Sequence, residues 1–348
     1  MSNKNLNVAI LGFGLSGSTF HAPLISTTSG LKLTHILSRQ TDKIKALYPD
    51  VTVCQSIDEI LASKEIDLVI NTLPNSEHYS ISRACLEAGK HVVVEKPFVI
   101  DSTDGAELIK LAESKNLVLS VYHNRRWDNG FLTLRKYLPE LGKIYLYQAS
   151  YDRFRPVVNL AKWREQDGNG NGILYDLGSH LIDQALTLFG KPQAVFADLD
   201  IQRENAVAVD YFEIVLYYDK LRVILGSSSV VANPRPILAI HGDKGSLIKY
   251  GLDPQEEQLK AGVTPLDDIY GVDKENQPNF TSGAENIHHK LNTEKGSYNE
   301  YYSQLHQCIV NNTHNPVMPN DALNVIKIIE LCQLSSKEQR LISCEGLF

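Results

Sequence analysis

The first third of the chain alternates short apolar runs with amphipathic stretches. Six runs are almost continuously apolar, which is typical of strands covered on both faces of a parallel sheet. These predicted strands are residues 6–11, 31–37, 51–54, 67–71, 91–94 and 117–121. Helical signals lie between them, including a capping-box pattern at Ser56 and Glu59 and a periodic run, residues 76–88, that stops at Gly89. The alternation predicts an α/β fold that begins with a doubly wound, parallel-sheet Rossmann domain.

Beyond residue 121 the runs are longer, and several alternate apolar with polar positions. They predict strands at residues 144–152, 194–202, 209–218, 221–226 and 238–241. Helical periodicity predicts helices at residues 173–189, 301–311 and 321–336. This part is expected to form an α+β domain with a large, mostly antiparallel open sheet that has one solvated or partner-facing side. Residues 251–299 have few periodic runs and are expected to be a long irregular excursion.

The length of 348 residues suggests two domains. We expect residues 1–121 to bind a dinucleotide and residues 122–348 to bind substrate and mediate oligomerisation, with a C-terminal helix able to pack back on the first domain.

Composition narrows the function classes. The net charge is −7 with acidic and basic residues intermixed, which argues against a nucleic-acid partner. The apolar runs are too short to cross a bilayer, and the N-terminal segment lacks the pattern of a signal peptide. Five scattered cysteines without CxxC spacing indicate buried, reduced thiols. These features are typical of a cytoplasmic protein without a membrane partner.

A glycine-rich turn follows the first predicted strand. Its residues are Gly12, Phe13, Gly14, Leu15, Ser16 and Gly17. In a βαβ context this G-x-G-x-x-G spacing predicts a dinucleotide site: Gly12 permits a tight turn, Gly14 lets a pyrophosphate approach, and Gly17 brings helix and strand together. The alternative is a structural turn without a ligand.

The end of the second predicted strand indicates which dinucleotide binds. No carboxylate occurs there before Asp42, whereas Ser38 and Arg39 offer a hydroxyl and a planar cation suited to a 2′-phosphate. We therefore expect NADP to be preferred, with NAD possible. The alternative is that Arg39 is solvated and that Asp42 reaches the ribose.

Another predicted cofactor segment follows the fourth strand, at the sheet edge where such folds bind ligands. It comprises Thr72, Leu73, Pro74 and Asn75. His78, just inside the next helix, could contact the cofactor or cap the helix.

A carboxylate and an imidazole lie four residues apart in the predicted helix at residues 173–189. Asp176, His180, Asp183 and Thr187 form its polar stripe. One interpretation is an ordinary solvated face, and the other is part of a proton-transfer site. A metal site is disfavoured, because one histidine and two carboxylates are few ligands for zinc and no Cys/His cluster supports them.

Several spaced motifs resemble those of the glucose–fructose oxidoreductase, inositol dehydrogenase and MocA (Gfo/Idh/MocA) family, over essentially the whole chain. The motifs are GFGLSG from residue 12, Glu95-Lys96-Pro97, YHNRRW at residues 122–127, Trp163-Arg164 and DLGSH at residues 176–180. The runs YHNRRWDN, RPVVNLAKWRE, YDLGSHLIDQ and KYGLDPQEE are most similar to the branch that contains NADP-dependent scyllo-inositol dehydrogenases.

The resemblance implies hydride transfer between nicotinamide C4 and a ring carbon of a sugar, cyclitol or related polyol. By position, Lys96 would reach the substrate hydroxyl and the cofactor ribose, and Asp176 and His180 would complete the catalytic group. Trp163 and Arg164 would contact the nicotinamide end, and the peptide before Pro97 is often cis in the family. Further expected cofactor contacts are Glu95, Lys96, Pro97 and Asn124, and further substrate contacts are Lys96, Arg125, Tyr151, Arg153, Asp176 and His180.

Chemistry suggests the same roles. An imidazole with an ordinary pKa near 6.5 can accept the proton of a hydroxyl that is being oxidised, so His180 is the expected general base. Asp176 would orient this ring or hold a second hydroxyl. Lys96 would stabilise the developing alkoxide. Arg125, Arg126 and Trp127 either line the substrate cleft or lock the domain junction.

Two rival functions use the same scaffold. One is a non-catalytic NADP-binding sensor or regulator, but such a protein would be expected to have lost Lys96, Asp176 or His180. The other is a reductase of imines, keto-sugars or tetrapyrroles. A broad open sheet also favours self-association as a homodimer or homotetramer.

Overall fold

A computed structural model describes residues 4–283 and 287–348, which divide into two compact units. The first unit contains the chain up to Trp127 together with Pro254–Gly271 and Ser297–Leu323. The second contains Asp128–Asp253, Val272–Gly296 and Asn324–Phe348. The sequence suggests a single boundary near residue 121, whereas in the structure two later segments belong to the first unit.

The first unit contains a six-stranded, all-parallel sheet in the order β3-β2-β1-β4-β5-β6. The strands are β1 (Leu6–Leu11), β2 (Leu31–Leu37), β3 (Thr52–Cys54), β4 (Leu68–Asn71), β5 (His91–Val94) and β6 (Leu119–Val121). All six lie within two residues of the predicted runs, so the doubly wound domain is confirmed. Leu11 pairs with Leu37 on one side and with Asn71 on the other, so the carboxyl ends of β1, β2 and β4 meet at one edge.

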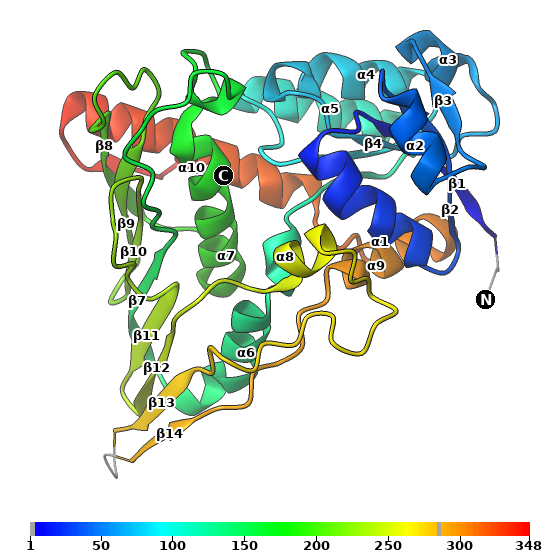
Figure 1. The fold of residues 1–348 in the computed structure, drawn as a ribbon. Coiled ribbons are helices and arrows are strands. Elements are labelled where there is room, and N and C mark those ends of the chain that lie inside the picture. The colour runs from blue at the N-terminus through cyan, green and yellow to red at the C-terminus, as the bar shows by residue number, and fades with distance from the viewer. Residues whose placement is uncertain (1–3, 284–286) are drawn as a thin grey trace. The chain divides into compact units, whose positions relative to one another are not determined.

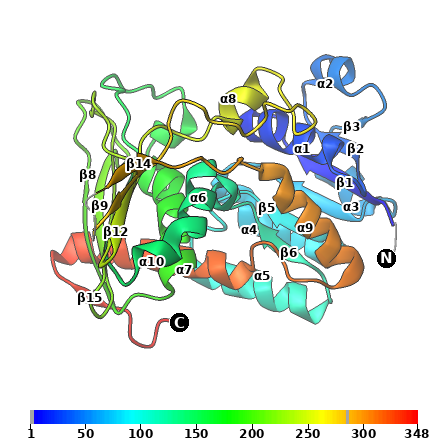
Figure 2. The same cartoon turned by 90° about the horizontal axis from the view of Figure 1, so that it is seen from below.

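Helices cover both faces of this sheet. The helices of this unit are α1 (Ala22–Thr27), α2 (Thr41–Leu47), α3 (Ile57–Ala62), α4 (His78–Glu87), α5 (Ser102–Ser114), α8 (Gln255–Lys260) and α9 (Tyr298–Asn311). Helix α1 packs against α9, and α4 packs against α5. Figures 1 and 2 show these two pairs on opposite faces of the sheet. Double coverage explains the continuous apolar strands, because both faces are removed from water. The predicted capping box at Ser56 and Glu59 is present at the start of α3.

The second unit is built on a nine-stranded sheet in the order β14-β13-β12-β11-β7-β10-β9-β8-β15. The strands are β7 (Ile144–Ser150), β8 (Ala194–Asp200), β9 (Tyr211–Tyr217), β10 (Arg222–Ser228), β11 (Leu238–Gly242), β12 (Gly245–Lys249), β13 (Asn279–Ser282), β14 (His288–Lys290) and β15 (Ile342–Ser343). The pairing is antiparallel except between β7 and β10. The predicted mostly antiparallel sheet is thus confirmed.

One face of this sheet carries helices. Figures 1 and 2 show α6 (Asn129–Tyr137) and α7 (Ser179–Phe189) on the same side of the strands. Alternate residues of β9, namely Phe212, Ile214 and Leu216, are fully buried, while the residues between them are partly exposed. The period of two therefore separates a packed face from a face that water reaches. The last long helix, α10 (Pro319–Glu338), contributes to both units.

The structure corrects several expectations for the later part of the chain. Residues 251–299 are not wholly irregular, because they contain α8, β13 and β14; residues 284–286 lie outside the described residues. Strands β12 and β15 were not predicted. The expected helix at residues 173–189 is present, but its first turn, Leu174–Gly178, is π-helical before the chain continues as α7. Part of each difference is that short or polar elements carry little periodic signal.

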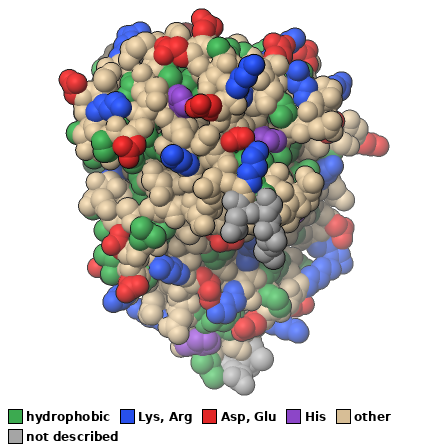
Figure 3. All heavy atoms as spheres, turned by 90° about the vertical axis from the view of Figure 1, so that its right-hand side faces the viewer, with side chains coloured by type: hydrophobic (Ala, Val, Ile, Leu, Met, Phe, Trp, Pro, Cys, Tyr) green, Lys and Arg blue, Asp and Glu red, His purple; other side chains and the backbone are tan. Residues whose placement is uncertain are grey.

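The surface and thiols agree with the composition. Basic and acidic side chains are interspersed on the face drawn in Figure 3. All five cysteines are buried and unpaired. Within residues 4–283 and 287–348, none of the helices combines the length and the apolar character needed to span a bilayer.

Candidate functional site

The glycine-rich loop follows β1 directly and is shaped by close backbone approach. Gly12 has φ of +98°, a conformation that favours glycine. A side chain at position 17 would collide with the carbonyl oxygen of Gly12. Gly14 and Leu15 are exposed, and an added Cβ on Gly14 would meet no described atom within 4 Å. The loop therefore presents open backbone, as a pyrophosphate requires.

The loop leads into a π-helical turn rather than directly into an α-helix. This first π-turn, Ser16–His21, continues as α1. Ser16 and His21 both reach Glu95 at the end of β5: the Ser16 hydroxyl donates to Glu95 Oε1, and His21 Nε2 lies 2.8 Å from the same oxygen. Sequence reasoning did not single out His21. The sequence around His21 does not reveal this role, because both the π-turn and the contact with Glu95 depend on residues that are distant in the sequence.

The adenosine end of the predicted site lies at the turn after β2. The side chain of Gln40 donates to the carbonyl oxygen of Phe13 at 3.0 Å and so joins this turn to the glycine loop. Arg39 is exposed, and its guanidinium has no hydrogen-bond or ion-pair partner in the described part of the chain. Lys43, which sequence reasoning passed over, lies with its Nζ 5.6 Å from the centre of the Phe13 ring. Two cations thus flank this turn, which fits an anionic group.

The segment after β4 is held against the Glu95-Lys96-Pro97 motif. The Thr72 hydroxyl donates to the carbonyl oxygen of Leu11 at 2.8 Å. His78 is buried, with Nδ1 2.7 Å from the Pro97 carbonyl oxygen and Nε2 3.0 Å from that of Leu73. Burial lowers the pKa of His78, so the neutral ring donates to one carbonyl at a time. Its structural role is to brace the two segments.

The peptide between Lys96 and Pro97 is cis. The backbone N–H of Lys96 donates to Glu95 Oε2 at 2.9 Å. Thus the Gly-loop residues, Thr72–Asn75 and the Glu95-Lys96-Pro97 motif meet at the carboxyl edge of one sheet.

The two arginines after β6 bind within the first unit. Arg125 Nη2 lies 3.9 Å from Glu256 Oε2, and Arg126 Nη2 lies 3.3 Å from Asp321 Oδ2. Asn124 is buried beside them. The contacts join the Rossmann core to the two segments that return to it from later in the chain. They also explain part of the KYGLDPQEE run, to which Glu256 belongs.

In the second unit, two arginines flank Asp176. Arg153 Nη1 is 3.7 Å from Asp176 Oδ2, and Arg164 Nε is 3.5 Å from Asp176 Oδ1. The Arg164 guanidinium also stacks on Trp163, 4.4 Å from the ring centre. Asp176 lies in the second π-turn, Leu174–Gly178, and 21% of its side chain is exposed. Predicted cofactor and substrate residues of this unit are therefore brought together.

The imidazole that follows is not on a solvated face. His180 and Asp183 are 5% and 2% exposed, whereas Thr187 at the far end of the stripe is exposed. The ordinary solvated-face interpretation is therefore wrong for His180 and Asp183, whose side chains are removed from water. Tyr151, another predicted substrate contact, is buried as well. Whether Lys96 meets Asp176 and His180 stays a prediction.

A buried arginine, which sequence reasoning missed, holds the loop that carries Arg153 and Arg164. Arg203 Nε donates to Asp210 Oδ2 at 2.8 Å, and its Nη1 lies 3.3 Å from Glu165 and 3.0 Å from the carbonyl oxygen of Arg155. Only 5% of its side chain is exposed. The pairing compensates a buried charge and fixes the position of the neighbouring Arg164.

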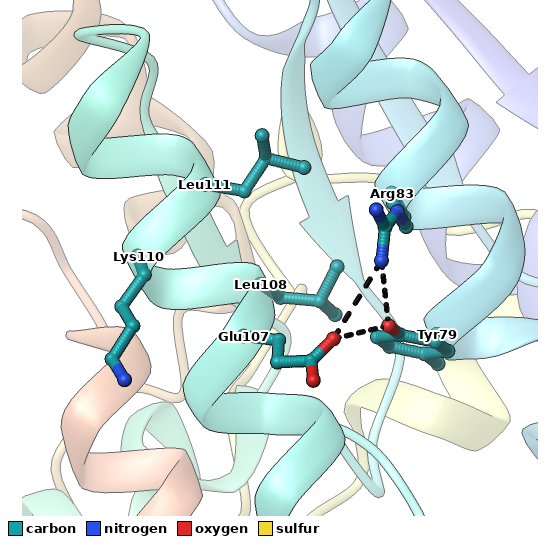
Figure 4. A pocket seen from close by; sticks show the side chains of 6 residues that line it. All are labelled: Tyr79, Arg83, Glu107, Leu108, Lys110 and Leu111. Atoms are coloured by element: carbon teal, nitrogen blue, oxygen red, sulfur yellow. Dashed lines mark hydrogen bonds and ion pairs between the residues drawn. The ribbon is translucent and has the colours of Figure 1, made fainter.

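A separate surface hollow lies between α4 and α5 and contains none of the predicted site residues. Its volume is about 230 Å³, and Figure 4 shows Tyr79, Arg83 and Glu107 turned toward one another in it. The Tyr79 hydroxyl donates to Glu107 at 2.5 Å, and Arg83 donates to Tyr79 at 3.0 Å. The polar groups of Tyr79, Arg83 and Glu107 thus form hydrogen bonds with one another. Among the described residues, no three His, Cys, Asp or Glu side chains are grouped as they would be around a metal ion.

Two family models match the chain. The model for the oxidoreductase family, NAD-binding Rossmann fold, matches residues 6–123. The model for the oxidoreductase family, C-terminal alpha/beta domain, matches residues 139–343. Both carry the GFO/IDH/MocA designation, and together they cover most of the sequence.

Similar proteins cover almost the full chain. Scyllo-inositol 2-dehydrogenase (NADP(+)) IolW of Bacillus subtilis (strain 168) is 45% identical over 348 residues, covering 98% of this chain and 96% of its own. The uncharacterized oxidoreductase YdgJ of Escherichia coli (strain K12) is 42% identical over 340 residues, covering 97% and 98%. A solved structure of the oxidoreductase YvaA from Bacillus subtilis superposes with a TM-score of 0.96 at 44% identity, covering 99% of this chain and 100% of that chain.

Proposed function

Because the chain belongs to the GFO/IDH/MocA oxidoreductase family, we propose that it transfers a hydride between C4 of NADP and a ring carbon of a cyclitol, sugar or related polyol. The observation that carries the proposal is the 45% identity, over 98% of the chain, to a protein named scyllo-inositol 2-dehydrogenase (NADP(+)). The chain also retains Lys96, Asp176 and His180, which a non-catalytic sensor would not need.

The residues present fit a dinucleotide. The glycine loop leaves the backbone above Gly14 open, and Gln40 ties the loop to the turn that carries Arg39. Arg39 and Lys43 would bind the 2′-phosphate of NADP, because a guanidinium pairs bidentately with phosphate oxygens and an ammonium adds a point charge. This charge arrangement favours NADP over NAD.

The second unit supplies the substrate-binding groups of the proposal. A bound nicotinamide would supply the acceptor for the hydride that leaves the carbinol carbon. His180 takes the proton of the substrate hydroxyl as the C–H bond breaks, so that a carbonyl forms. Lys96 stabilises the negative charge that builds on the oxygen before the proton has fully left. Asp176 binds a neighbouring hydroxyl, and its ion pairs with Arg153 and Arg164 orient it.

We also propose self-association through the helix-free face of the second unit's sheet. Phe196 on β8 is 37% exposed, and it pairs with Val215 of β9, which pairs in turn with Ile224 of β10; these last two side chains are partly exposed. Apolar and aromatic side chains on a broad sheet favour a second copy as the partner. Light scattering coupled to size exclusion should give a dimer or tetramer, and a charged residue in place of Phe196 should shift it toward the monomer.

The test of activity is direct. The protein with NADP⁺ is expected to raise absorbance at the reduced nicotinamide band when scyllo-inositol or another polyol from a panel of inositols, glucose, xylose and glucosides is added. The reaction should be slower with NAD⁺. Tight cofactor binding with no turnover on any polyol, keto-sugar or imine would instead favour a sensor.

A further inference from the structure

Three side chains from distant parts of the first unit form a continuous chain behind the glycine loop. His21 of the first π-turn lies between Glu95 at the end of β5 and Tyr302 on α9: its Nε2 is 2.8 Å from Glu95 Oε1, and its Nδ1 meets the Tyr302 hydroxyl. Ser16, inside the glycine loop itself, donates to the same Glu95 oxygen. Glu95 is therefore linked to both ends of the turn.

The π-turn geometry explains how two residues five apart can share one acceptor. In an α-helix, residues five apart are rotated by about 140° from each other, so Ser16 and His21 would face different neighbours. A π-turn closes its hydrogen bonds between residues five apart, which places these side chains on one side. A single carboxylate can then bind both, and in doing so it favours the π-turn over an α-helical start.

Burial makes these contacts strong. The His21 side chain is fully buried and lies 4.5 Å from the Tyr122 ring, centre to centre, and Tyr302 is fully buried as well. Only 13% of the Glu95 side chain is exposed. Burial alone would raise the pKa of Glu95, but the hydrogen bond and charge of His21, the hydrogen bond from Ser16 and the nearby Lys96 charge lower it to about 2. The carboxylate is thus ionised and accepts hydrogen bonds only.

The ionised carboxylate fixes which group donates the hydrogen bond between Glu95 and His21. Because ionised Glu95 cannot donate, the proton between it and His21 belongs to Nε2. The other ring nitrogen, Nδ1, forms its hydrogen bond with the Tyr302 hydroxyl. Tyr302 therefore fixes the orientation of the ring in which Nε2 holds Glu95. Tyr301, its neighbour, donates instead to Ser120 at 2.9 Å and lies outside this chain of contacts.

We propose that Tyr302 and His21 are positioning residues, which hold Glu95 so that the first π-turn keeps the shape needed to bind the dinucleotide phosphates. The phosphate-facing backbone of the loop is set by where Ser16 lies, and Ser16 is set by Glu95. The same carboxylate accepts the backbone N–H of Lys96, so the support also reaches the proposed catalytic lysine. The inference rests on the dinucleotide binding in the proposed function and is independent of which substrate is oxidised.

The test compares two buried hydroxyls on the same helix. Tyr302→Phe should weaken NADPH binding, measured by cofactor fluorescence, by roughly tenfold, the size expected for one buried hydrogen bond. It should also speed deuterium exchange of the amides of residues 14–21. Tyr301→Phe removes an equally buried hydroxyl and should leave both readouts within about twofold of the unaltered protein. Equal effects of the two variants would reduce Tyr302 to a packing role and overturn the proposal.

A second measurement needs no variant. The ¹⁵N chemical shifts of the His21 ring in the cofactor-free protein should show the proton on Nε2, and a ring protonated on Nδ1 alone would contradict the chain of contacts. Failure of the polyol panel would leave both readouts unaffected, because neither requires a substrate. The two proposals can therefore fail separately.

Discussion

The two π-turns begin alike and end in different environments. The first, Ser16–His21, and the second, Leu174–Gly178, each follow a glycine-containing loop and continue into an α-helix. In the first, the polar side chains close on one buried carboxylate, Glu95. In the second, Asp176 is partly exposed, and its ion pairs with Arg153 and Arg164 are 3.7 and 3.5 Å long. The first turn thus ends in contacts removed from water, whereas the second holds a carboxylate that water partly reaches.

The difference teaches how one local geometry can serve two purposes. A group that holds a bound molecule works best when it does not move, so its side chains are satisfied in advance. A group that binds hydroxyls of a substrate must remain accessible until the substrate arrives. We therefore expect changes in the first turn to alter cofactor affinity and changes near the second turn to alter turnover.

The largest expected effect tests the second region. His180→Ala should lower kcat by about 10²–10⁴-fold, because the general base is removed. NADPH affinity, measured by fluorescence, should stay close to that of the unaltered protein. Near-normal turnover would show that the imidazole next to the second turn does not accept the proton.

Substitutions at two glycines of the glycine-rich loop are expected to affect cofactor binding and folding stability separately. Gly17→Ala should lower the free energy of unfolding by about 1–3 kcal/mol, because the new methyl group overlaps the carbonyl of Gly12. Gly14→Ala has open space and should change it by less than about 0.5 kcal/mol, yet still weaken NADPH binding. Urea titration and cofactor titration measure the two quantities. If Gly14→Ala binds NADPH normally, the phosphates do not approach there.

The next prediction tests whether the nucleotide-binding region discriminates between NADPH and NADH. Arg39→Ala should raise the Kd for NADPH by roughly tenfold to a hundredfold, the value of one charge-assisted contact. The Kd for NADH should be unchanged. Since Arg39 is exposed and has no partner among the described residues, thermal stability should be unaffected. An equal loss for both dinucleotides would place Arg39 away from the 2′-phosphate.

The contribution of Glu95 to the stability of the fold is expected to depend on pH. Its pKa in the fold is about 2, below the ordinary value of 4.5, because the hydrogen bonds from His21 and Ser16 outweigh burial. The ionised group therefore stabilises the fold above about pH 4.5, and this contribution is lost as the pH falls from about 4.5 to about 2. The melting-temperature difference between the unaltered protein and Glu95→Gln should shrink over that window. A constant difference would mean that the charge of Glu95 does not matter.

The smallest effect is expected for the arginines that form ion pairs with Asp176 of the second turn. Arg164→Leu removes one long, half-exposed ion pair and should lower stability by less than about 1 kcal/mol. It should raise KM for the polyol a few-fold while kcat changes less, because Asp176 keeps Arg153 as a neighbour. Arg222→Leu, whose guanidinium stacks on Tyr217, is a matched control for loss of an arginine on this unit and should leave KM unchanged.

The parallel sheet was the most predictable part of the fold. Its strands are buried on both faces, so runs such as residues 91–94 are apolar throughout and stand out locally. Strand β14 is exposed at all three positions, and β15 has two residues that pair only with β8, so neither has a pattern of its own. Helix α8, within residues 251–299, was not predicted because it has only six residues and most of them are polar.

The site was predictable where a motif is contiguous and less so where contacts are distant. The glycine loop and the Lys96-Pro97 pair could be recognised directly. His21, Tyr302 and Arg203 could not, because their roles depend on partners up to 281 residues away. The π-turns were also unpredictable, since periodicity at residues 173–189 fits an α-helix and the departure from it comes from tertiary contacts.

The chain passes between its two units five times, after residues 127, 253, 271, 296 and 323. A ribosome that has made the whole nucleotide-binding sheet has not yet made α9, which carries Tyr302. The nascent first unit must therefore wait for about 180 further residues before His21 gains its buried neighbour. A fragment ending at Trp127 would carry every phosphate-loop glycine and still be unfinished, so gene fusions or truncations that treat this part as a portable module should produce a poorly ordered product.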